Sequence, residues 1–208
     1  YAGSETVVGL TLATEDSLPI DVELVENSHV LVKYEGERAI LKALESIERG
    51  HRAMKDHGRG IVIQHPNIPD LGTIPIPNRE SALRYNYFLE DEDGKKRRGT
   101  TMFTSRGCPE RCAFCDSPGL WGRGVRYTPM NRVIEEFEQI QSLGFDAIQF
   151  YDDILPLHKG RMLEMCSELK KLEFIWRCFC RVDIMSHNNY GKEFMRTLHK
   201  SGLREVLV

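Results

Sequence analysis

Apolar residues along the second half of the chain alternate between short runs and helical spacing. Short apolar or β-branched runs at 100–105, 147–151, 175–180 and 204–208 predict strands. Between them lie segments with apolar side chains every three or four positions, the clearest from Thr128 and Pro129 to Gly144 and another at 192–200. A Thr cap followed by Pro is a favoured helix start. This repeated strand–helix order predicts a parallel (β/α) barrel or open parallel sheet over 99–208.

The first stretch, 1–60, shows a shorter version of this alternation. Strand candidates lie at 6–8 and 30–32, and a helix is expected from Ala39 to Arg49 with Gly50 as its stop signal. The apolar face of that helix comprises Ile40, Leu41, Leu44 and Ile47. Two strands and one helix do not complete a doubly wound domain. We therefore interpret 1–60 as the C-terminal part of an α/β domain.

The stretch between these two, 61–98, differs in composition. Four prolines make a long helix there implausible: Pro66, Pro69, Pro75 and Pro77. It ends in an acidic run, an Asp93-Gly94 turn and a basic run, a pattern typical of a β-hairpin with cross-strand ion pairs. A basic patch for a phosphate-bearing substrate is the alternative, which the neighbouring acids weaken by cancelling its field. We expect 61–98 to be a linker and hairpin.

Charge and composition narrow the function classes. The 28 Lys and Arg against 31 Asp and Glu give a net charge of −3, which argues against a basic nucleic-acid binder. No run approaches the roughly 18 apolar residues that cross a bilayer. The chain begins at Tyr1 and ends within an apolar run, Val206 to Val208. We expect a piece of a longer cytoplasmic protein that binds neither nucleic acid nor membrane.

Three of the six cysteines, Cys108, Cys112 and Cys115, lie within eight residues. Without an export signal, this spacing indicates metal or redox chemistry in a reducing cytoplasm. The segment follows the strand expected at 100–105, and parallel α/β folds place their chemistry at the carboxyl ends of strands. Soft thiolates suit an iron–sulfur cluster, and with no fourth thiolate nearby one iron would stay open to a ligand. The remaining cysteines are expected to be buried small hydrophobes: Cys166, Cys178 and Cys180.

A zinc site is the alternative for the cysteine segment. Zinc requires four tetrahedral ligands, usually from two separated Cys or His pairs. The sequence shows no second pair, and the nearest following histidine, His158, lies in a different expected loop. Iron–sulfur chemistry is therefore favoured.

The cysteine motif resembles that of radical S-adenosylmethionine (SAM) enzymes. The residues that carry this resemblance are Cys-x3-Cys-x2-Cys, Phe114 before the last Cys, and the preceding Thr104-Ser105-Arg106-Gly107. The resemblance implies that Cys108, Cys112 and Cys115 bind a [4Fe-4S] cluster. It also implies that the open iron chelates SAM, that reductive cleavage releases a 5′-deoxyadenosyl radical, and that Phe114 packs near the adenine.

Further SAM contacts are expected at strand ends. Asp153, with Asp152 as the second candidate, is expected to hold the SAM ammonium, while capping of the following loop and helix is the alternative. Arg181 is expected to bind the SAM carboxylate or the substrate, or else to form a structural ion pair with Asp183. Trp121 would shield the cluster or anchor its loop.

The order of half-domain, linker and barrel is similar to the cobalamin-binding subgroup of these enzymes. Gly9 and the segment from Tyr34 to Glu37 match the end of that subgroup's Rossmann-like cobalamin domain, although Leu12 stands where members often carry histidine. The subgroup implies hydrogen abstraction from an unactivated carbon, then methylation or ring formation. It also implies a small-molecule substrate and a reductant such as flavodoxin or ferredoxin. A radical SAM enzyme without cobalamin and a non-catalytic iron–sulfur or zinc protein remain alternatives, and the piece alone is expected to be inactive.

Overall fold

The computed structural model describes residues 7–9, 30–33, 35–48, 61–64, 67–115, 117–186 and 190–208. The chain forms two compact units. The first comprises Tyr1–Pro69 and Gly107–Val125, and the second comprises Asp70–Arg106 and Arg126–Val208. The cysteine segment is thus grouped with the first unit, although both of its ends continue into the second. In the described ranges, no helix has the length and apolar content to cross a lipid bilayer.

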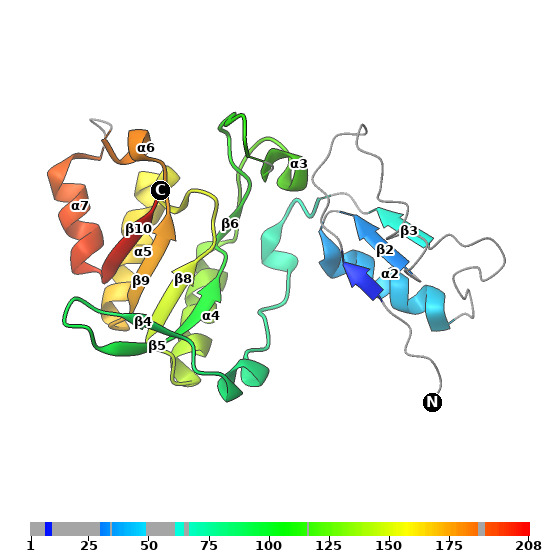
Figure 1. Cartoon of the computed structure of the whole chain (residues 1–208), viewed down its shortest axis with the longest axis horizontal. Helices are drawn as coiled ribbons and strands as arrows, with labels where there is room; N and C mark the ends of the chain where they lie inside the picture. The colour runs from blue at the N-terminus through cyan, green and yellow to red at the C-terminus, as the bar shows by residue number, and fades with distance from the viewer. Residues whose placement is uncertain are drawn as a thin grey trace. The chain divides into compact units, whose positions relative to one another are not determined.

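The first unit contains a parallel sheet of three short strands. These are β1 (Val7–Gly9), β2 (Val30–Lys33) and β3 (Ile61–Gln64), in the order β1-β2-β3, and α2 (Gly36–Glu48) follows β2 (Figure 1). The strands expected at 6–8 and 30–32 are confirmed within one residue. The expected start of a linker at residue 61 is wrong, because the β-branched run of β3 pairs with β2 over all four of its positions.

The helix α2 begins three residues before its expected start and buries a different face. Ala39 and Ala43, one turn apart, are fully buried, whereas Leu41 and Leu44 are 59% and 47% exposed. Leu41 and Leu44, which lie on the apolar face expected from the sequence, are therefore not buried. Helical periodicity located the helix, but the small alanine side chains are the ones that pack.

The second unit is built on a five-stranded sheet (Figure 1). Its strands are β4 (Phe88–Glu90), β5 (Lys96–Met102), β8 (Ala147–Phe150), β9 (Ile175–Phe179) and β10 (Leu203–Leu207), in the order β10-β9-β8-β5-β4. The last four strands in sequence pair in parallel. They are separated along the chain by α4 (Met130–Ser142), α5 (Lys159–Lys171) and α7 (Gly191–Lys200). The expected parallel α/β half-barrel is thereby confirmed over these strands.

The strand β4 makes the sheet mixed, which corrects the expectation of a purely parallel one. It pairs antiparallel with β5 from Phe88 opposite Arg98 to Glu90 opposite Lys96, and Gly94 occupies the turn with φ of 72°. The expected hairpin is thus confirmed, but its second strand continues directly into the first parallel strand. The expected domain boundary between 98 and 99 falls inside β5.

Short elements fill the connections. They are η1 (Leu71–Thr73), η2 (Glu80–Arg84), β6 (Ser105–Arg106), α3 (Ser117–Trp121), β7 (Arg126–Tyr127), η3 (Leu155–Leu157) and α6 (Val182–Ser186). The expected side-chain cap of α4 by Thr128 is not formed. Pro129 occupies the cap position, and the Thr128 N–H donates to the Thr104 carbonyl at 2.9 Å.

Side chains alternate between the two faces of the sheet, as successive residues of a strand do. Ile148 and Phe150 of β8 pack with Trp176 of β9 in the main apolar core, in the company of residues from α4, α5 and α7. On the other face, Gln149 and Arg177 line a hollow of about 300 Å³ together with residues of β4 and β5. One face of the sheet therefore forms the core and the other an open, partly polar surface.

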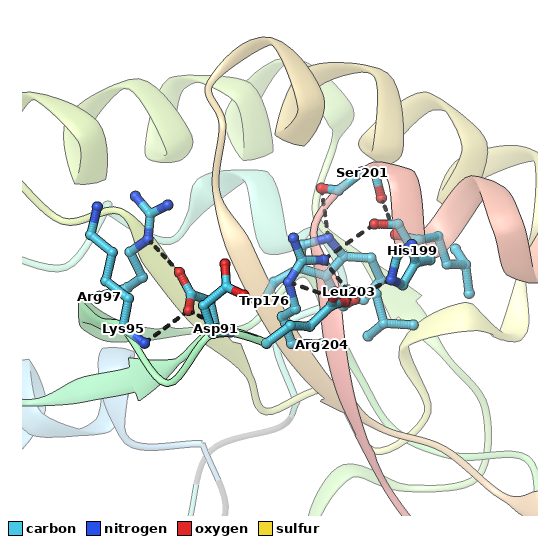
Figure 2. Close-up of polar contacts among 11 residues, drawn as sticks. Asp91, Lys95, Arg97, Trp176, His199, Ser201, Leu203 and Arg204 are labelled. Carbon is cyan, nitrogen blue, oxygen red and sulfur yellow. Dashed lines mark hydrogen bonds and ion pairs between the residues drawn. The ribbon is translucent and has the colours of Figure 1, made fainter.

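The turn of the β4–β5 hairpin carries polar contacts to distant parts of the second unit (Figure 2). The Asp91 carboxylate accepts from Arg97 Nε at 3.3 Å. Glu92 Oε1 lies 2.7 Å from His199 Nε2 at the end of α7 and 3.7 Å from Arg204 Nε on β10. Glu92 and His199 are both about 60% exposed, so their pair contributes little by itself. Together these contacts join the hairpin turn to the opposite edge strand.

A buried ion pair fastens the segment before β4 to the half-barrel. Arg79 is 6% exposed, and its guanidinium donates to the carboxylate of Glu136 on α4. It also donates to Gln139 Oε1 at 2.9 Å and to the Thr101 carbonyl at 3.0 Å. Burial raises the pKa of Glu136, and the charge of Arg79 opposes that rise. The Arg79 side chain thus connects the residues just before η2 to α4 and β5.

Candidate functional site

The three clustered cysteines lie on the segment between β6 and β7. None of the three forms a disulfide, and their exposure increases along the chain from buried Cys108 through Cys112 to exposed Cys115. Cys108 forms an isolated β-bridge with Arg123. The Cys115 N–H donates to the Cys112 carbonyl at 3.1 Å, so these two residues close one tight turn. Cys108 therefore lies at the neck of the segment, where residues 107–108 approach residues 123–124. Cys112 and Cys115 lie between these two ends.

Two glycines allow that neck to close. Gly107 has φ of 97°, and a Cβ atom placed on it would lie 2.1 Å from the Gly124 carbonyl oxygen. A side chain at this position would therefore both strain the backbone and collide with the opposite chain. The Gly preceding the first cysteine is required by this close approach.

The donor chemistry of the segment fits an iron–sulfur cluster. Three thiols, none engaged in a disulfide, lie within eight residues, and soft sulfur ligands suit iron. Over the described ranges, however, no three Cys, His, Asp or Glu side chains are gathered closely enough to hold a metal ion. Ligation by Cys108, Cys112 and Cys115 therefore stays a prediction from their spacing.

Two aromatic residues of this segment occupy different environments. Phe114 is 93% exposed. The Trp121 carbonyl, at the end of α3, accepts from Asn67 Nδ2 at 2.8 Å. This backbone contact fastens the segment within the first unit, whereas the role of the Trp121 ring and the adenine contact of Phe114 stay predictions.

The cysteine segment leaves the second unit from a two-stranded ribbon. β6 and β7 pair antiparallel, with Ser105 opposite Tyr127 and Arg106 opposite Arg126. Arg106 precedes the segment and Arg126 follows it directly. Both covalent connections of residues 107–125 therefore pass through this ribbon.

Asp152, two residues after the end of β8, is buried and hydrogen-bonded to the start of the ribbon. Its Oδ1 accepts from the Thr104 N–H at 2.7 Å, and its Oδ2 accepts from the Thr104 hydroxyl at 2.7 Å and from the Ser105 hydroxyl. Burial raises the pKa of Asp152, while these hydrogen bonds act in the opposite direction. The expected alternative, capping of the loop and helix after it, is wrong for these contacts, because the partners precede Asp152 in the chain.

Arg161 in the first turn of α5 completes this contact and was missed by sequence reasoning. Its Nη2 donates to the Thr104 carbonyl at 3.3 Å, and its guanidinium carbon lies 5.2 Å from the centre of the Tyr127 ring. Burial lowers the pKa of Arg161, and the charge of Asp152 opposes this. No local pattern marks Arg161, because its partners lie 57 and 34 residues earlier in the chain.

The other expected SAM contacts lie at strand ends. Asp153 is partly exposed beside Tyr151, whose ring lies 5.9 Å from that of Phe103. Arg181, after β9, forms a two-point ion pair with Asp183, Nε to Oδ1 at 2.9 Å and Nη2 to Oδ2 at 2.7 Å. These bonds lower the pKa of Asp183. The structural ion pair expected as the alternative for Arg181 is thus formed, and SAM contacts by Asp153 and Arg181 stay predictions.

Thiol reactivity separates the two groups of cysteines. Burial raises the pKa of Cys180 to about 11, so roughly one Cys180 in a thousand is a thiolate at pH 8. In the metal-free folded chain, iodoacetamide at pH 8 is expected to modify exposed Cys115 first and to leave Cys166, Cys178 and Cys180 unmodified. Peptide mass spectrometry of timed samples measures this, with urea-unfolded chain as the control in which all six react. Equal rates for Cys180 and Cys115 would contradict the buried placement.

Comparisons with known proteins match this chain to methyltransferases. No protein-family profile matches it. An uncharacterized methyltransferase of Pyrococcus horikoshii is 27% identical over 190 residues, which cover 85% of this chain and 39% of that protein. The hopanoid C-2 methylase of Rhodopseudomonas palustris is 32% identical over 112 residues, covering 53% of this chain and 19% of the methylase.

Solved structures of one radical SAM methyltransferase share the fold. TsrM from Kitasatospora setae, with cobalamin and a [4Fe-4S] cluster bound, matches 85% of this chain and 36% of its own at a TM-score of 0.53 and 17% identity. Its complex with tryptophan and a SAM analogue matches at 0.54 and 18%. The chain thus spans about two fifths or less of each of these relatives. Its sequence relatives include methyltransferases, and it shares the fold of part of TsrM, a radical SAM methyltransferase.

Proposed function

We propose that the whole enzyme is a cobalamin-dependent radical SAM methyltransferase that acts on an unactivated carbon of a small molecule. One observation carries this proposal: a Cys-x3-Cys-x2-Cys segment follows the first parallel strand of a half-barrel whose sequence relatives are methyltransferases. Chemistry at the carboxyl ends of parallel strands is the rule for such folds. Ring formation is the other outcome open to the same radical chemistry.

The cysteine segment would hold the iron–sulfur cluster through Cys108, Cys112 and Cys115. When bound there, a [4Fe-4S] cluster supplies an open iron for SAM and the electron that cleaves its carbon–sulfur bond. The chain's own contribution is the neck at Gly107, which fixes where the first ligand leaves the ribbon. The outer position of Cys112 and Cys115 leaves their thiols accessible for cluster assembly.

Side chains of the chain would orient SAM. Phe114, exposed on the cysteine segment, offers an aromatic face for the adenine. Asp153, which is partly exposed, would accept hydrogen bonds from the SAM ammonium. Arg181 would bind the SAM carboxylate, provided that its guanidinium exchanges or shares its contact with exposed Asp183.

Cobalamin, the substrate and the reductant are proposed for the whole enzyme. Cobalamin is carried by TsrM, and the parallel sheet and α2 of the first unit suit the end of such a domain. Leu12, which stands where a histidine often does, lies outside the described residues. A small-molecule substrate accords with the tryptophan bound to TsrM, and a flavodoxin or ferredoxin would deliver the electron.

Anaerobic reconstitution of the full-length enzyme with iron and sulfide tests the proposal. We expect a brown protein with about four irons per chain that, once reduced, converts SAM to 5′-deoxyadenosine and retains added cobalamin through gel filtration. A colourless zinc protein would overturn the proposal. A brown protein that never cleaves SAM would support the non-catalytic alternative, and SAM cleavage without cobalamin retention would support a radical SAM enzyme lacking cobalamin.

A further inference from the structure

The geometry points to Asp152 and Arg161 as positioning residues that hold the ribbon from which the cysteine segment leaves. This inference rests on the proposed function for its consequence, but its contacts are independent of any cofactor. It assigns Asp152 to the protein scaffold of the cluster rather than to the SAM ammonium.

Both oxygens of the Asp152 carboxylate already accept hydrogen bonds from the ribbon side. Asp152 is 1% exposed, and three donors from Thr104 and Ser105 reach its two oxygens. Thr104 and Ser105 are themselves 1% and 3% exposed. Hydrogen bonds to a buried carboxylate are stronger than neutral ones, and loss of the acceptor would leave three buried donors without it. Asp152, just after β8, therefore fixes the chain where it enters β6.

Arg161 holds the other strand of the ribbon as well. Its guanidinium donates to the Thr104 carbonyl and lies against the face of Tyr127 on β7. The same Thr104 carbonyl accepts the Thr128 N–H, just after β7. Contacts from β8 and α5 thus converge on the incoming and outgoing strands together.

The ribbon connects the cysteine segment to the second unit at both ends. Gly107 directly follows β6, and Gly124 lies two residues before β7. Because the ribbon is only two residue pairs long, its own ladder cannot keep the two strands in place. A ribbon freed from Asp152 would let the two chain ends of the cysteine segment move independently. The three cysteines would then hold a cluster less tightly.

The two roles open to Asp152 predict different behaviour. A residue that binds the SAM ammonium affects the KM for SAM and leaves the cluster unchanged in the absence of SAM. A residue that holds the ribbon affects the cluster without SAM, and the same effect follows when its partners on the ribbon are changed.

The experiment uses the full-length reconstituted enzyme and the variant Asp152→Asn, in which the amide keeps one carbonyl acceptor but loses the second. Thr104→Val and Ser105→Ala remove two of the same hydrogen bonds from the ribbon side. Asp146→Asn is the matched control, because it neutralises a carboxylate at the opposite end of the same strand. Cluster loss to EDTA, followed by absorbance without SAM, is the main measurement, and the EPR line shape of the reduced cluster is the second.

We expect Asp152→Asn and the combined Thr104→Val/Ser105→Ala variant each to lose the cluster about tenfold faster than wild type, the change that one charge-assisted hydrogen bond brings. Their EPR line shapes should change alike, and the triple variant should show less than the sum of the two effects. Asp146→Asn should stay within about twofold of wild type. Cluster loss and line shape at wild-type values, with a raised KM for SAM in Asp152→Asn alone, would overturn the inference in favour of SAM binding.

Hydrogen exchange separates this inference from the proposed function. In the metal-free protein, Asp152→Asn should speed amide exchange at 104–106 and 126–128 and leave exchange in α4 unchanged. Asp146→Asn should not speed exchange at 104–106 or 126–128. If wild type binds no iron, the proposed function fails, and this measurement still decides whether Asp152 holds the ribbon. Unchanged exchange in the variant would overturn the inference whatever the iron content.

Discussion

Replacing Cys112 by alanine in the full-length enzyme is expected to reduce SAM cleavage to background, a loss of about a thousandfold or more. Cys112 is one of three thiols proposed to hold the cluster, and its partly exposed position outside the neck gives it no role in the apolar core. The folded protein should therefore remain while the iron is lost. Iron content, absorbance near 400 nm and 5′-deoxyadenosine by mass spectrometry measure this.

Cys166 provides the control within the same chain. It is buried on α5 among apolar side chains, and burial raises its pKa, so it offers no thiolate to a metal. Cys166→Ala should keep the iron content and SAM cleavage of wild type. If Cys112→Ala keeps its iron and turns over SAM normally, the ligand assignment is wrong, whereas loss of iron from both variants would indicate a general effect on folding.

Replacing Arg79 by methionine is expected to lower the free energy of unfolding by about 3–5 kcal/mol at pH 7. The variant keeps the buried carboxylate of Glu136 but removes its cationic partner, and the Thr101 carbonyl and Gln139 lose a donor. Urea unfolding followed by far-UV circular dichroism measures the change. A loss below about 1 kcal/mol would contradict the buried placement of this pair.

The pH dependence of the same variant follows from the direction of the Glu136 shift. Burial raises the pKa of Glu136, and removing Arg79 takes away the charge that opposes this rise. The folded state then holds the proton at a higher pH than the unfolded state, so stability falls as the pH rises through that window. Arg79→Met should recover part of its stability between pH 7 and pH 5.

Two further variants define the interaction. Arg79→Met combined with Glu136→Leu should recover most of the loss, because an apolar pair replaces the unpaired charge. Glu135→Gln on the same helix removes the partner of Arg132 in an exposed pair and should cost less than about 1 kcal/mol. A double variant as unstable as the single one would mean that the other bonds of Arg79, rather than the stranded charge, account for the effect.

The sequence predicts the local elements of the second unit well, because their signals are local. The runs at 147–151 and 175–180 predict strands, and the two-residue period of a strand accounts for Ile148 and Trp176 in the core and Gln149 and Arg177 on the opposite face. The positions of the hairpin turn at Gly94 and the stop at Gly144 follow from glycine's tolerance of positive φ. Periodicity and turn chemistry act over a few residues, so one sequence contains them.

What the sequence does not predict depends on partners far apart in the chain. Arg79 and Glu136 are 57 residues apart, and Thr104 and Asp152 are 48 apart. Nothing in the local sequence of these residues indicates that they pair with one another. The choice of Ala39 over Leu41 as the buried face of α2 likewise depends on what the helix packs against. The candidate cluster ligands can be identified from their motif. The residues that hold the ribbon beside the motif can be identified only once the fold is known.

The β4–β5 hairpin also bears on how the chain folds during synthesis. Its two strands are joined by a five-residue turn and can pair within microseconds of emerging from the ribosome. The parallel strands of the same sheet each require a crossover, which slows their pairing. Glu92 and its partner His199 are 107 residues apart, roughly 5–20 s of translation.

β8 ends 48 residues after β5, roughly 2–10 s of translation, and until then the hairpin would expose the edge of β5 that receives β8. Unpaired edges invite association with other chains, and charged residues oppose it. The acidic and basic runs flanking Gly94 place charge at this point. The same charges that later join the turn to α7 and β10 would thus oppose association of the nascent chain with other chains until the parallel strands pair.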